Sequence, residues 1–237
     1  MGRLNSSEAN GTTGETKPQQ EGRILIVTAV EAEREAVLRG LGHSTRFEVM
    51  AAGVGPAIAA ANTATKLALS SVPYRLVISA GIGGGFPGQA ELGDIVVSTR
   101  IIAADLGAQT QEEGGFLSVD ELGFGSSQVA VEPAVVSRVK EALLAAGMQA
   151  VGGAALTVST ATGTAERAAQ LIKHNPDAAS EGMEGHGAAV AAQLAGIPAM
   201  ELRAISNAVG PRDRAAWRIG DALQSLTRAF EILTEVL

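Results

Sequence analysis

The chain has 237 residues, of which 46% are hydrophobic, and a formal net charge of −7. This length is enough for one α/β domain with a sizeable core. The negative charge argues against nucleic acid or an anionic membrane surface as the main partner. The sequence has no cysteine, which excludes a disulfide framework and thiolate chemistry. Its three scattered histidines argue against a zinc site.

The first 22 residues differ in composition from the rest of the chain. They are rich in Ser, Gly, Thr, Asn, Glu and Gln and lack an apolar cluster, so we expect a flexible tail followed by a single domain over residues 23–237. No apolar segment typical of a secretory signal follows the first residues, and no apolar run reaches the length of a membrane span. We therefore expect a cytoplasmic protein without a membrane partner.

From residue 23 onward, short apolar runs alternate with segments of helical spacing. The expected strands lie at residues 23–29, 47–52, 76–80, 92–102, 151–159 and 200–207. The expected helices are 31–41, a segment from Pro56 to about Leu69, 133–146, 165–173, a Gly/Ala-rich segment ending at Leu194, and 215–237. This alternation predicts an α/β fold with a largely parallel sheet and helices on both faces.

Glycine-rich segments interrupt this pattern. The turn at residues 53–55 is a possible anion cradle at a helix N-terminus, although it lacks the third glycine of a dinucleotide fingerprint. Four glycines at residues 81–85 indicate either close backbone approach or positive φ. The polar segment 105–125, which contains Phe116 and Phe124, is either an active-site flap or a long loop.

Polar side chains gather where the predicted strands end. They are Glu33, Ser79, Thr162, Ser206 and Asn207. Ligands of open α/β sheets bind outside the carboxyl ends of the strands, so we expect these residues to form one site. The last strand also carries Glu201 and Arg203, which predict an internal ion-pair network or a part of that site.

Four segments of the sequence resemble the purine nucleoside phosphorylase and nucleosidase superfamily. They are residues 29–33, 53–55, 79–81 with 93–98, and Met183-Glu184 with residues 203–207. The resemblance covers residues 23–237. It implies the three-layer fold of that superfamily, with a mixed, mostly parallel central sheet and helices on both faces, and a small-molecule nucleoside as substrate.

Within this superfamily, residues 29–33 resemble the hydrolytic branch typified by methylthioadenosine/S-adenosylhomocysteine nucleosidase. The resemblance implies that Glu33 activates the attacking water, that Glu184 binds the ribose hydroxyls and that Asn207 binds the base. It also implies that Arg203 and Ser79 lie near the water. The expected substrate-binding residues are Ser79, Ala80, Gly81, Thr162, Met183, Arg203 and Ser206.

Two departures from adenine-specific nucleosidases shift the expected base. Position 207 is Asn where those enzymes have Asp, and an amide cannot act as an acid but can donate to N7 or O6 of a 6-oxopurine. The turn at 160–164 lacks their aromatic residue. Together with residues 181–185 and 206–213, these features most resemble the futalosine hydrolase family, which removes hypoxanthine from futalosine in the alternative menaquinone pathway. The resemblance implies no metal and no organic cofactor, and it leaves open which group protonates the base.

Alternatives remain for the activity and for individual residues. The activity could be that of another purine nucleosidase, a phosphate-dependent purine nucleoside phosphorylase or a nucleoside-binding sensor without catalysis. Glu33 could be a carboxylate that favours the helix dipole, with Glu31 as a confusable neighbour, and Arg203 could simply pair with Glu201.

For five further positions we favour a structural role. We predict surface ion pairs for residues 212–214, a satisfied helix histidine at His186 and a packing residue of the last helix at Trp217. The family forms homo-oligomers, so we expect a dimer or larger assembly, with segment 105–125 as the place to look for its interface.

Overall fold

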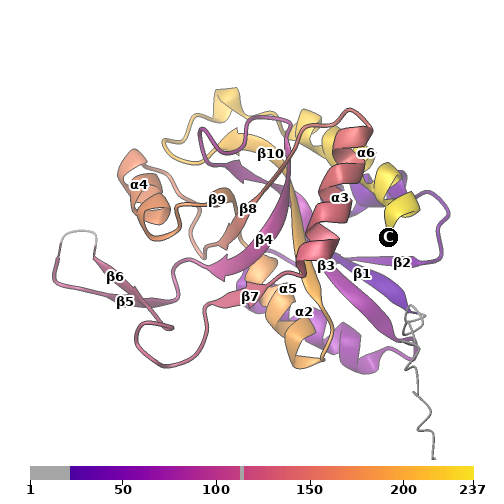
Figure 1. Cartoon of the computed structure of the whole chain (residues 1–237), viewed down its shortest axis with the longest axis horizontal. Helices are drawn as coiled ribbons and strands as arrows, with labels where there is room; N and C mark the ends of the chain where they lie inside the picture. The colour runs from indigo at the N-terminus through magenta and orange to yellow at the C-terminus, as the bar shows by residue number, and fades with distance from the viewer. Residues whose placement is uncertain (1–21, 113–114) are drawn as a thin grey trace, which may run out of the picture.

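The computed structural model describes residues 22–112 and 115–237, and the predicted tail lies almost entirely outside them. The described chain is an α/β structure (Figure 1). Its strands are β1 Arg23–Thr28, β2 Phe47–Ala51, β3 Tyr74–Gly85, β4 Ile95–Ala103, β5 Gly107–Gln109, β6 Phe116–Ser118, β7 Gln128–Ala130, β8 Ala150–Thr157, β9 Ala178–Gly182 and β10 Ala199–Ala208. Its helices are α1 Glu31–Leu41, α2 Pro56–Leu69, α3 Pro133–Ala145, α4 Ala165–His174, α5 Gly185–Leu194, the 3₁₀ turn η1 Arg214–Ala216 and α6 Ile219–Val236.

Eight strands form one mixed sheet, which confirms the predicted fold class. The order is β10-β4-β8-β9-β3-β1-β2, with β7 on β4 and an additional pairing of β10 with β3. Five strands, β3, β10, β4, β8 and β9, therefore close into a ring. Strands β1, β2, β3 and β10 are parallel to one another, and so are β4, β8 and β9, but the two groups meet in antiparallel pairs.

Strand β3 has one edge that serves two partners. Along this edge β1 pairs with β3 as far as Ser79, and β9 pairs with it only at Gly84 and Gly85. The opposite edge pairs with β10 from Val77 to Gly85. The sheet thus forks between Ser79 and Gly84, where the backbone groups of one edge need partners other than a strand.

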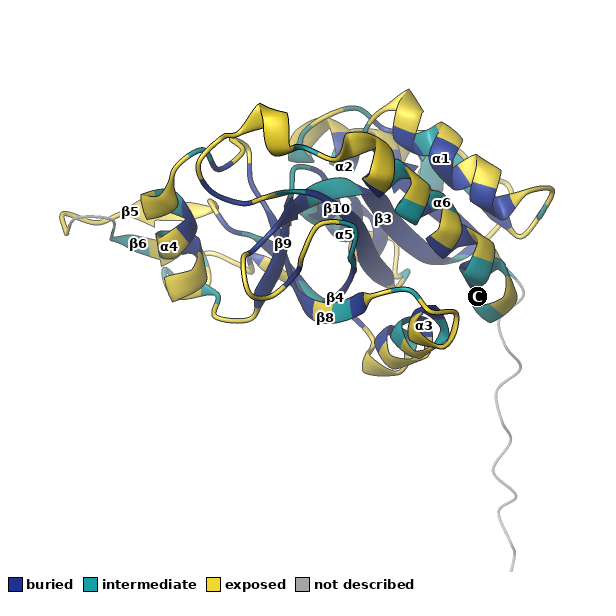
Figure 2. Ribbon diagram, turned by 90° about the horizontal axis from the view of Figure 1, so that it is seen from above, coloured by how far each residue is buried: buried dark blue, intermediate teal, exposed yellow. Residues whose placement is uncertain are grey.

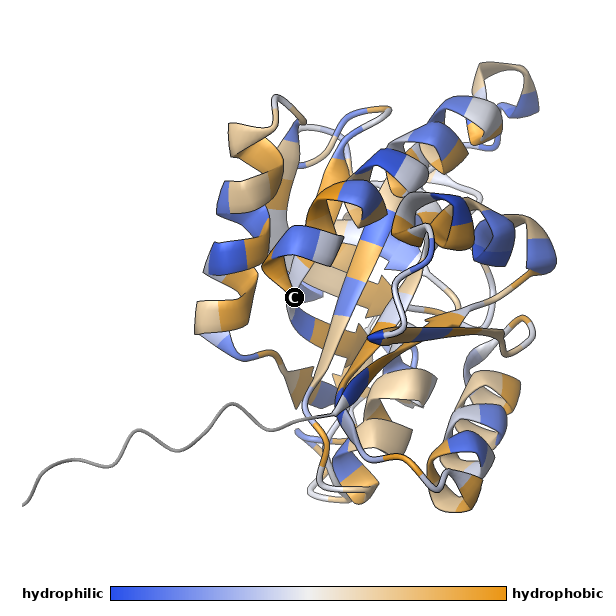
Figure 3. Cartoon of the chain, turned by 90° about the vertical axis from the view of Figure 1, so that its right-hand side faces the viewer, coloured by the Kyte–Doolittle hydropathy of each residue, from blue (hydrophilic) through white to orange (hydrophobic). Residues whose placement is uncertain are grey.

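Helices cover the strands on both sides. Helix α1 packs against α6, which also contacts α3, and α2 packs against α5 on the other side of the sheet. The central strands are buried while the helices expose their outer faces (Figure 2). Hydrophilic residues lie on those outer faces and hydrophobic residues face the strands (Figure 3). Helix α5 is an exception, because its Gly and Ala residues are mostly buried, as expected for a helix that packs closely on several neighbours.

The structure corrects four predictions. Strand β3 continues to Gly85 instead of ending at residue 80, and its glycines have no positive φ, so close backbone approach is the correct alternative there. Strands β7 and β9 were not predicted, because β7 has only three residues and β9 carries Ser180 and Glu181. The last helix begins at Ile219 instead of residue 215.

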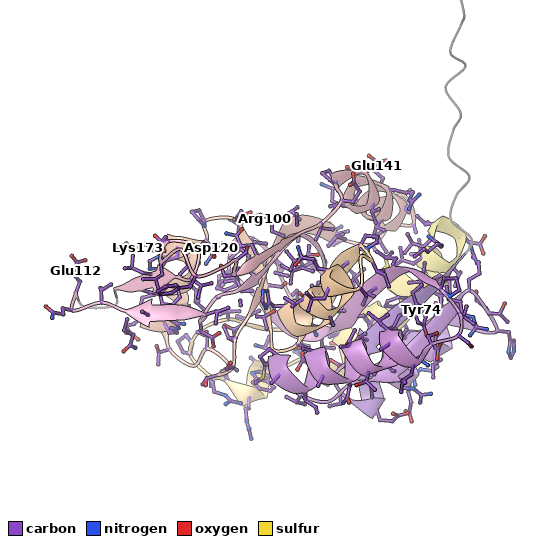
Figure 4. All side chains as sticks on the ribbon, turned by 90° about the horizontal axis from the view of Figure 1, so that it is seen from below. Tyr74, Arg100, Glu112, Asp120, Glu141 and Lys173 are labelled. Carbon is purple, nitrogen blue, oxygen red and sulfur yellow. The ribbon has the colours of Figure 1, made fainter. Side chains whose placement is uncertain are left out.

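Segment 105–125 contains the antiparallel pair β5–β6, which projects from the body beside α4 (Figure 1). Glu112 lies toward the tip of this projection (Figure 4). Phe116 packs edge-on against His174 with 5.8 Å between ring centroids, whereas Phe124 is 84% exposed. The segment is therefore neither a long loop nor part of the wall of the main pocket described below.

Among the described residues, no helix is both long and apolar enough to cross a membrane. The same part of the chain contains no group of three or more His, Asp or Glu side chains placed to hold a metal ion.

Candidate active site

A pocket opens where the sheet forks, between the parts of β3 that pair with β1 and with β9. It is lined by residues from the ends of β1, β3, β9 and β10 and from the turns after β8 and β10. Six predicted site residues line it: Glu33, Thr162, Met183, Glu184, Ser206 and Asn207. The other four, Ser79, Ala80, Gly81 and Arg203, lie behind its wall, and all four are buried.

Glu33 is held at the fork by backbone donors. One carboxylate oxygen accepts from the N–H groups of Ala29 at 2.9 Å and Val30 at 3.2 Å. The other oxygen accepts from the N–H of Ile82 at 2.9 Å. Ile82 lies on β3 between the part that pairs with β1 and the part that pairs with β9. Glu33 is only 4% exposed. It caps the first turn of α1, as one alternative proposed, and it also presents its carboxylate to the pocket.

Glu184 faces the same pocket from the start of α5. Its carboxylate accepts from the N–H of Gly55 at 3.1 Å, from Met183 N–H at 3.3 Å and from the Arg203 guanidinium at 3.3 Å. Gly55 has φ of 101°, a conformation that favours glycine. The predicted anion cradle at residues 53–55 therefore binds a carboxylate of the protein itself.

Arg203 connects the buried polar groups. Its guanidinium donates to Glu201 at 2.7 Å, to the Ser79 hydroxyl at 3.2 Å and to the Ile82 carbonyl at 3.4 Å, in addition to Glu184. Burial alone would lower the pKa of Arg203, but the carboxylates of Glu201, Glu184 and Glu33 raise this pKa above its usual range. The residue therefore stays charged. It pairs with Glu201, as one alternative predicted, and it also pairs with Glu184, whereas its predicted place near the attacking water stays a prediction.

The side chains of Glu33, Arg203 and Glu201 fill space beside two glycines that have no side chain of their own. A Cβ at Gly81 would lie 2.4 Å from Glu33 Oε1 and 2.6 Å from Arg203 Nη1. A Cβ at Gly185 would lie 1.8 Å from Glu201 Oε2. Any side chain at either position would displace the carboxylates.

Asn207 and Ser206 end β10 beside the pocket. The Ser206 hydroxyl is 2.9 Å from Asn207 Oδ1 and 3.2 Å from the Gly83 carbonyl. The Asn207 amide donates to the Ala208 carbonyl at 3.0 Å. Because a side-chain amide has two N–H donors, one remains available to a ligand.

Glu181 lines the pocket and was not among the predicted site residues. It is 7% exposed, and its two oxygens accept from the Thr162 N–H at 2.9 Å and the Thr162 hydroxyl at 2.5 Å. Burial raises the pKa of Glu181, while the bonds from Thr162 lower it. A signal was present in the sequence, because a carboxylate two residues before Met183 is unusual at the end of a buried strand.

Three predictions of a structural role are wrong. Arg212 lines the pocket, and neither Arg212 nor Arg214 forms an ion pair with the described residues; both guanidinium groups lie over the Trp217 ring, at 5.4 and 5.9 Å from its centroid. Trp217 precedes α6 and lines the pocket instead of packing within the last helix. His186 does not line it, and its buried Nε2 has no hydrogen-bond partner in the described chain, so it is not a satisfied histidine.

The charges of the site are unbalanced. Glu33, Glu181 and Glu184 line the pocket, and the buried Arg203 behind them is already paired with Glu184 and Glu201. Such a site attracts developing positive charge and disfavours an anion. It offers a fixed carboxylate for proton transfer, a second carboxylate for hydroxyl groups, and an amide for a planar polar ligand.

Comparisons with known proteins agree with this arrangement. A family model described as the phosphorylase superfamily matches residues 10–237. The chain is 49% identical to a futalosine hydrolase of Streptomyces coelicolor over 90% of this chain and 96% of that protein. It is 44% identical to a futalosine hydrolase of Acidothermus cellulolyticus, over 88% and 89% of the two chains. The solved structure of a futalosine hydrolase from Helicobacter pylori has the same fold, with a TM-score of 0.77, 17% identity, and coverage of 91% of this chain and 98% of that one.

Proposed function

Because this chain belongs to the phosphorylase superfamily and, within it, to the futalosine hydrolase family, we propose that residues 23–237 form a nucleosidase domain that hydrolyses the N-glycosidic bond of futalosine. The products are hypoxanthine and dehypoxanthine futalosine, and the reaction belongs to the alternative menaquinone pathway. The observation that carries this proposal is the carboxylate of Glu33, fixed by three backbone N–H groups at the edge of the pocket.

Glu33 is the base that activates water. A carboxylate has about four acceptor sites, and three of those of Glu33 accept from backbone N–H groups. The remaining site accepts a proton of the attacking water. The bond between C1′ and N9 breaks, the water oxygen bonds to C1′, and the water proton passes to Glu33. A positioned base of this kind contributes about 10²–10⁴-fold to the rate.

Glu184 binds the ribose hydroxyls. Gly55, Met183 and Arg203 fix its orientation, while Met183 lines the pocket beside it. N-glycosidic cleavage develops positive charge on the sugar. The negative charges of Glu33 and Glu184, held in a buried site, stabilise that charge more strongly than water would.

Asn207 holds the departing base. Its free N–H donates to N7 or O6 of hypoxanthine, and Ser206 orients its amide. The electron pair of the broken bond moves onto the purine ring, where hydrogen bonds to N7 and O6 stabilise it before the ring takes up a proton.

The charge balance favours hydrolysis over phosphorolysis. A phosphate nucleophile needs cationic groups near C1′, but Arg203 is committed to two carboxylates, and Glu33 and Glu184 would repel the phosphate. Arg212, which also lines the pocket, is exposed and lies over Trp217. A sensor without catalysis would not need the fixed Glu33 carboxylate.

Incubation of the purified protein with futalosine, inosine and methylthioadenosine, each with and without phosphate, tests this proposal. Chromatography should detect hypoxanthine from futalosine at a rate independent of phosphate. Release that requires phosphate would favour the phosphorylase, release of adenine but not hypoxanthine would refute the base assignment, and no release at all would favour the sensor.

The oligomeric state of the protein and its location in the cell stay predictions. We propose a homo-oligomer, supported by the exposed apolar side chains Val54, at 56%, and Phe124, at 84%. Light scattering coupled to size-exclusion chromatography would reveal a mass near that of the monomer if this is wrong. A cytoplasmic location is the corresponding expectation for the cell.

A further inference from the structure

One buried carboxylate beside the pocket has no role in the proposed mechanism. Glu201 lies on β10, which pairs with β3 and β4 on its two sides, and it is 1% exposed and does not line the pocket. Such a strand is normally an unbroken apolar run. A buried ion pair seldom stabilises a fold more than apolar side chains of similar volume would, so the pairing with Arg203 does not by itself account for this residue.

Glu201 lies between the sheet and the start of α5. The register pairs it with Ser79 on β3 and pairs Arg203 with Gly81, and paired residues present their side chains to the same face of a sheet. Glu201 Oε1 accepts from Arg203 Nε at 2.7 Å. A Cβ at Gly185, the first residue of α5, would lie 1.8 Å from Glu201 Oε2. The carboxylate therefore contacts both the guanidinium and the first residue of this helix.

Both contacts of Glu201 lead to Glu184. Glu184 directly precedes Gly185, at the N-cap of α5, so the backbone that packs against Glu201 also sets the position of the Glu184 Cα. The Glu184 carboxylate accepts from Arg203 Nη2 at 3.3 Å. Glu201 is thus connected to Glu184 once through the backbone and once through the guanidinium.

The guanidinium of Arg203 divides one of its edges between two carboxylates. Nε and Nη2 donate along the same edge of the planar group, and this edge can bind a single carboxylate through two parallel bonds. Here Nε donates to Glu201, whereas Nη2 donates to Ser79 at 3.2 Å and to Glu184. Because Nε is occupied, this edge cannot bind Glu184 through two bonds. The Glu184 carboxylate, which lines the pocket, therefore keeps an acceptor site for a ligand.

We propose that Glu201 is a positioning residue for the sugar site, which holds Glu184 in the orientation that binds the ribose hydroxyls. It does so by occupying Arg203 Nε and by packing against Gly185. This proposal rests on the proposed function, in which Glu184 binds those hydroxyls. Without the Glu201 carboxylate, Arg203 turns its free edge to Glu184 and draws that carboxylate away from the sugar.

A positioning role through Glu184 affects only one part of the ligand. The hydrogen bond between a ribose hydroxyl and a buried charged acceptor is lost when the acceptor moves, while the contacts of the base stay the same. A role in stability alone would change the binding of all ligands alike or leave it unchanged. The two roles therefore differ in the preference for a nucleoside with a 2′-hydroxyl over its 2′-deoxy analogue.

Calorimetry on two C-nucleosides measures this preference without requiring turnover. In 9-deazainosine and its 2′-deoxy analogue, a carbon–carbon bond that hydrolysis does not cleave joins the sugar to the base. The wild type should bind the ribonucleoside about 10–100-fold more tightly than the deoxynucleoside. Glu201→Gln keeps the shape of the side chain, but its neutral amide oxygen competes less well for the guanidinium than the Glu184 carboxylate does. This variant should therefore reduce the ratio by about 10-fold.

Ser98→Ala is the matched control for a loss of stability. The buried Ser98 hydroxyl accepts from the backbone N–H of Glu201 at 2.8 Å, so the substitution disturbs the same position of β10 without removing the carboxylate. It should lower the midpoint of urea denaturation and keep the wild-type binding ratio.

Glu201→Asp keeps the test decisive if Glu201→Gln does not fold. It retains the charge beside Arg203 but shortens the side chain by one methylene, which weakens the bond to Nε and the contact with Gly185, so the ratio should again fall. A wild type that does not prefer the ribonucleoside would overturn the role of Glu201. So would an unchanged ratio in Glu201→Gln, or in Glu201→Asp where only that variant folds. If futalosine is still hydrolysed in that case, the proposed function stands; if the wild type hydrolyses no futalosine, the proposed function falls while the binding ratios still test Glu201.

Discussion

The two ends of the central sheet differ in the burial of their charged groups and in the balance of carboxylates and cations. At the amino-terminal end, the single carboxylate of Glu48 pairs with Lys66 and with Arg23, and it accepts from the Tyr74 hydroxyl at 2.5 Å. The side chains of Arg23, Glu48 and Lys66 are 44%, 30% and 34% exposed. Figure 4 shows Tyr74 far from the β5–β6 projection, at the opposite end of the molecule.

At the other end, where β3 forks, three carboxylates surround one cation. Glu33, Glu184 and Glu201 are each at most 4% exposed, and so is Arg203. The hydrogen bonds from Lys66 and Tyr74 lower the pKa of Glu48, whereas burial raises the pKa of Glu201 despite its bond to Arg203.

This difference indicates what each end is for. Exposed pairs with enough cations contribute a little stability and no chemistry. Buried carboxylates in excess reduce stability, and proteins retain such groups where a ligand or a reaction requires them. Substitutions at the forked end should therefore affect activity and stability strongly, and those at the amino-terminal end should not.

The largest effect is expected from Glu33→Gln. The amide cannot accept a proton from water, so kcat for hypoxanthine release should fall by about 10²–10⁴-fold, as measured by chromatography at saturating futalosine. Glu31→Gln is the control, because Glu31 is 59% exposed and, among the described residues, its ion pair is with Arg34 on the surface of the same helix. Equal rates in wild type and Glu33→Gln would remove the base from the mechanism.

Arg203→Ala should be the most destabilising of the charge substitutions. It leaves Glu184 and Glu201 buried without their cation, which typically costs about 3–5 kcal/mol of unfolding free energy. Arg23→Ala at the amino-terminal end removes an exposed pair at 3.7 Å and should cost about 1 kcal/mol or less. Urea denaturation measures both, and similar losses for the two variants would contradict the contrast between the ends.

Gly185→Ala should destabilise the protein by about 1–3 kcal/mol, because the added methyl would overlap Glu201 Oε2. The matched substitution Gly220→Ala in α6 meets nothing within 4 Å and should be neutral or slightly stabilising. Thermal unfolding of the two variants compares them, and a neutral Gly185→Ala would show that the Glu201 carboxylate is free to move.

The smallest effects are pH-dependent and opposite in sign. Glu48 has a lowered folded pKa, so its stabilising contribution is present above the unfolded pKa and is lost as pH falls through the folded value. Glu48→Gln should therefore be destabilising by about 1 kcal/mol or less near neutral pH, with the loss disappearing in acid.

Burial raises the folded pKa of Glu181, so protonation of this carboxyl is more favourable in the folded than in the unfolded chain, and that contribution to stability is lost as pH rises through the folded pKa. The stability of Glu181→Gln relative to wild type should therefore increase with pH. Denaturation series at several pH values would reveal the two trends, and parallel trends would contradict the different roles of the two carboxyls.

The longer strands and the helices were predictable because they depend on local periodicity. Of the predicted strand-end residues, Glu33, Thr162, Ser206 and Asn207 line one pocket, and Ser79 lies behind its wall. The fork was not predictable, because β9 is short and polar and its pairing with Gly84 involves residues almost a hundred positions away. The Glu181–Thr162 contact and the role of Arg203 as a shared partner depend on that register. Trp217 was misassigned because the break between η1 and α6 leaves no clear periodic signal.

The identity of the nucleophile is the most direct measurement. Futalosine is incubated with the protein in H₂¹⁸O containing phosphate, and the sugar product is examined by mass spectrometry. Activation of water by Glu33, in a pocket too anionic for phosphate, predicts one ¹⁸O atom in the sugar product and no sugar phosphate. A sugar 1-phosphate without ¹⁸O at C1′ would show that phosphate enters the site, and would contradict the hydrolytic role of the carboxylate cluster.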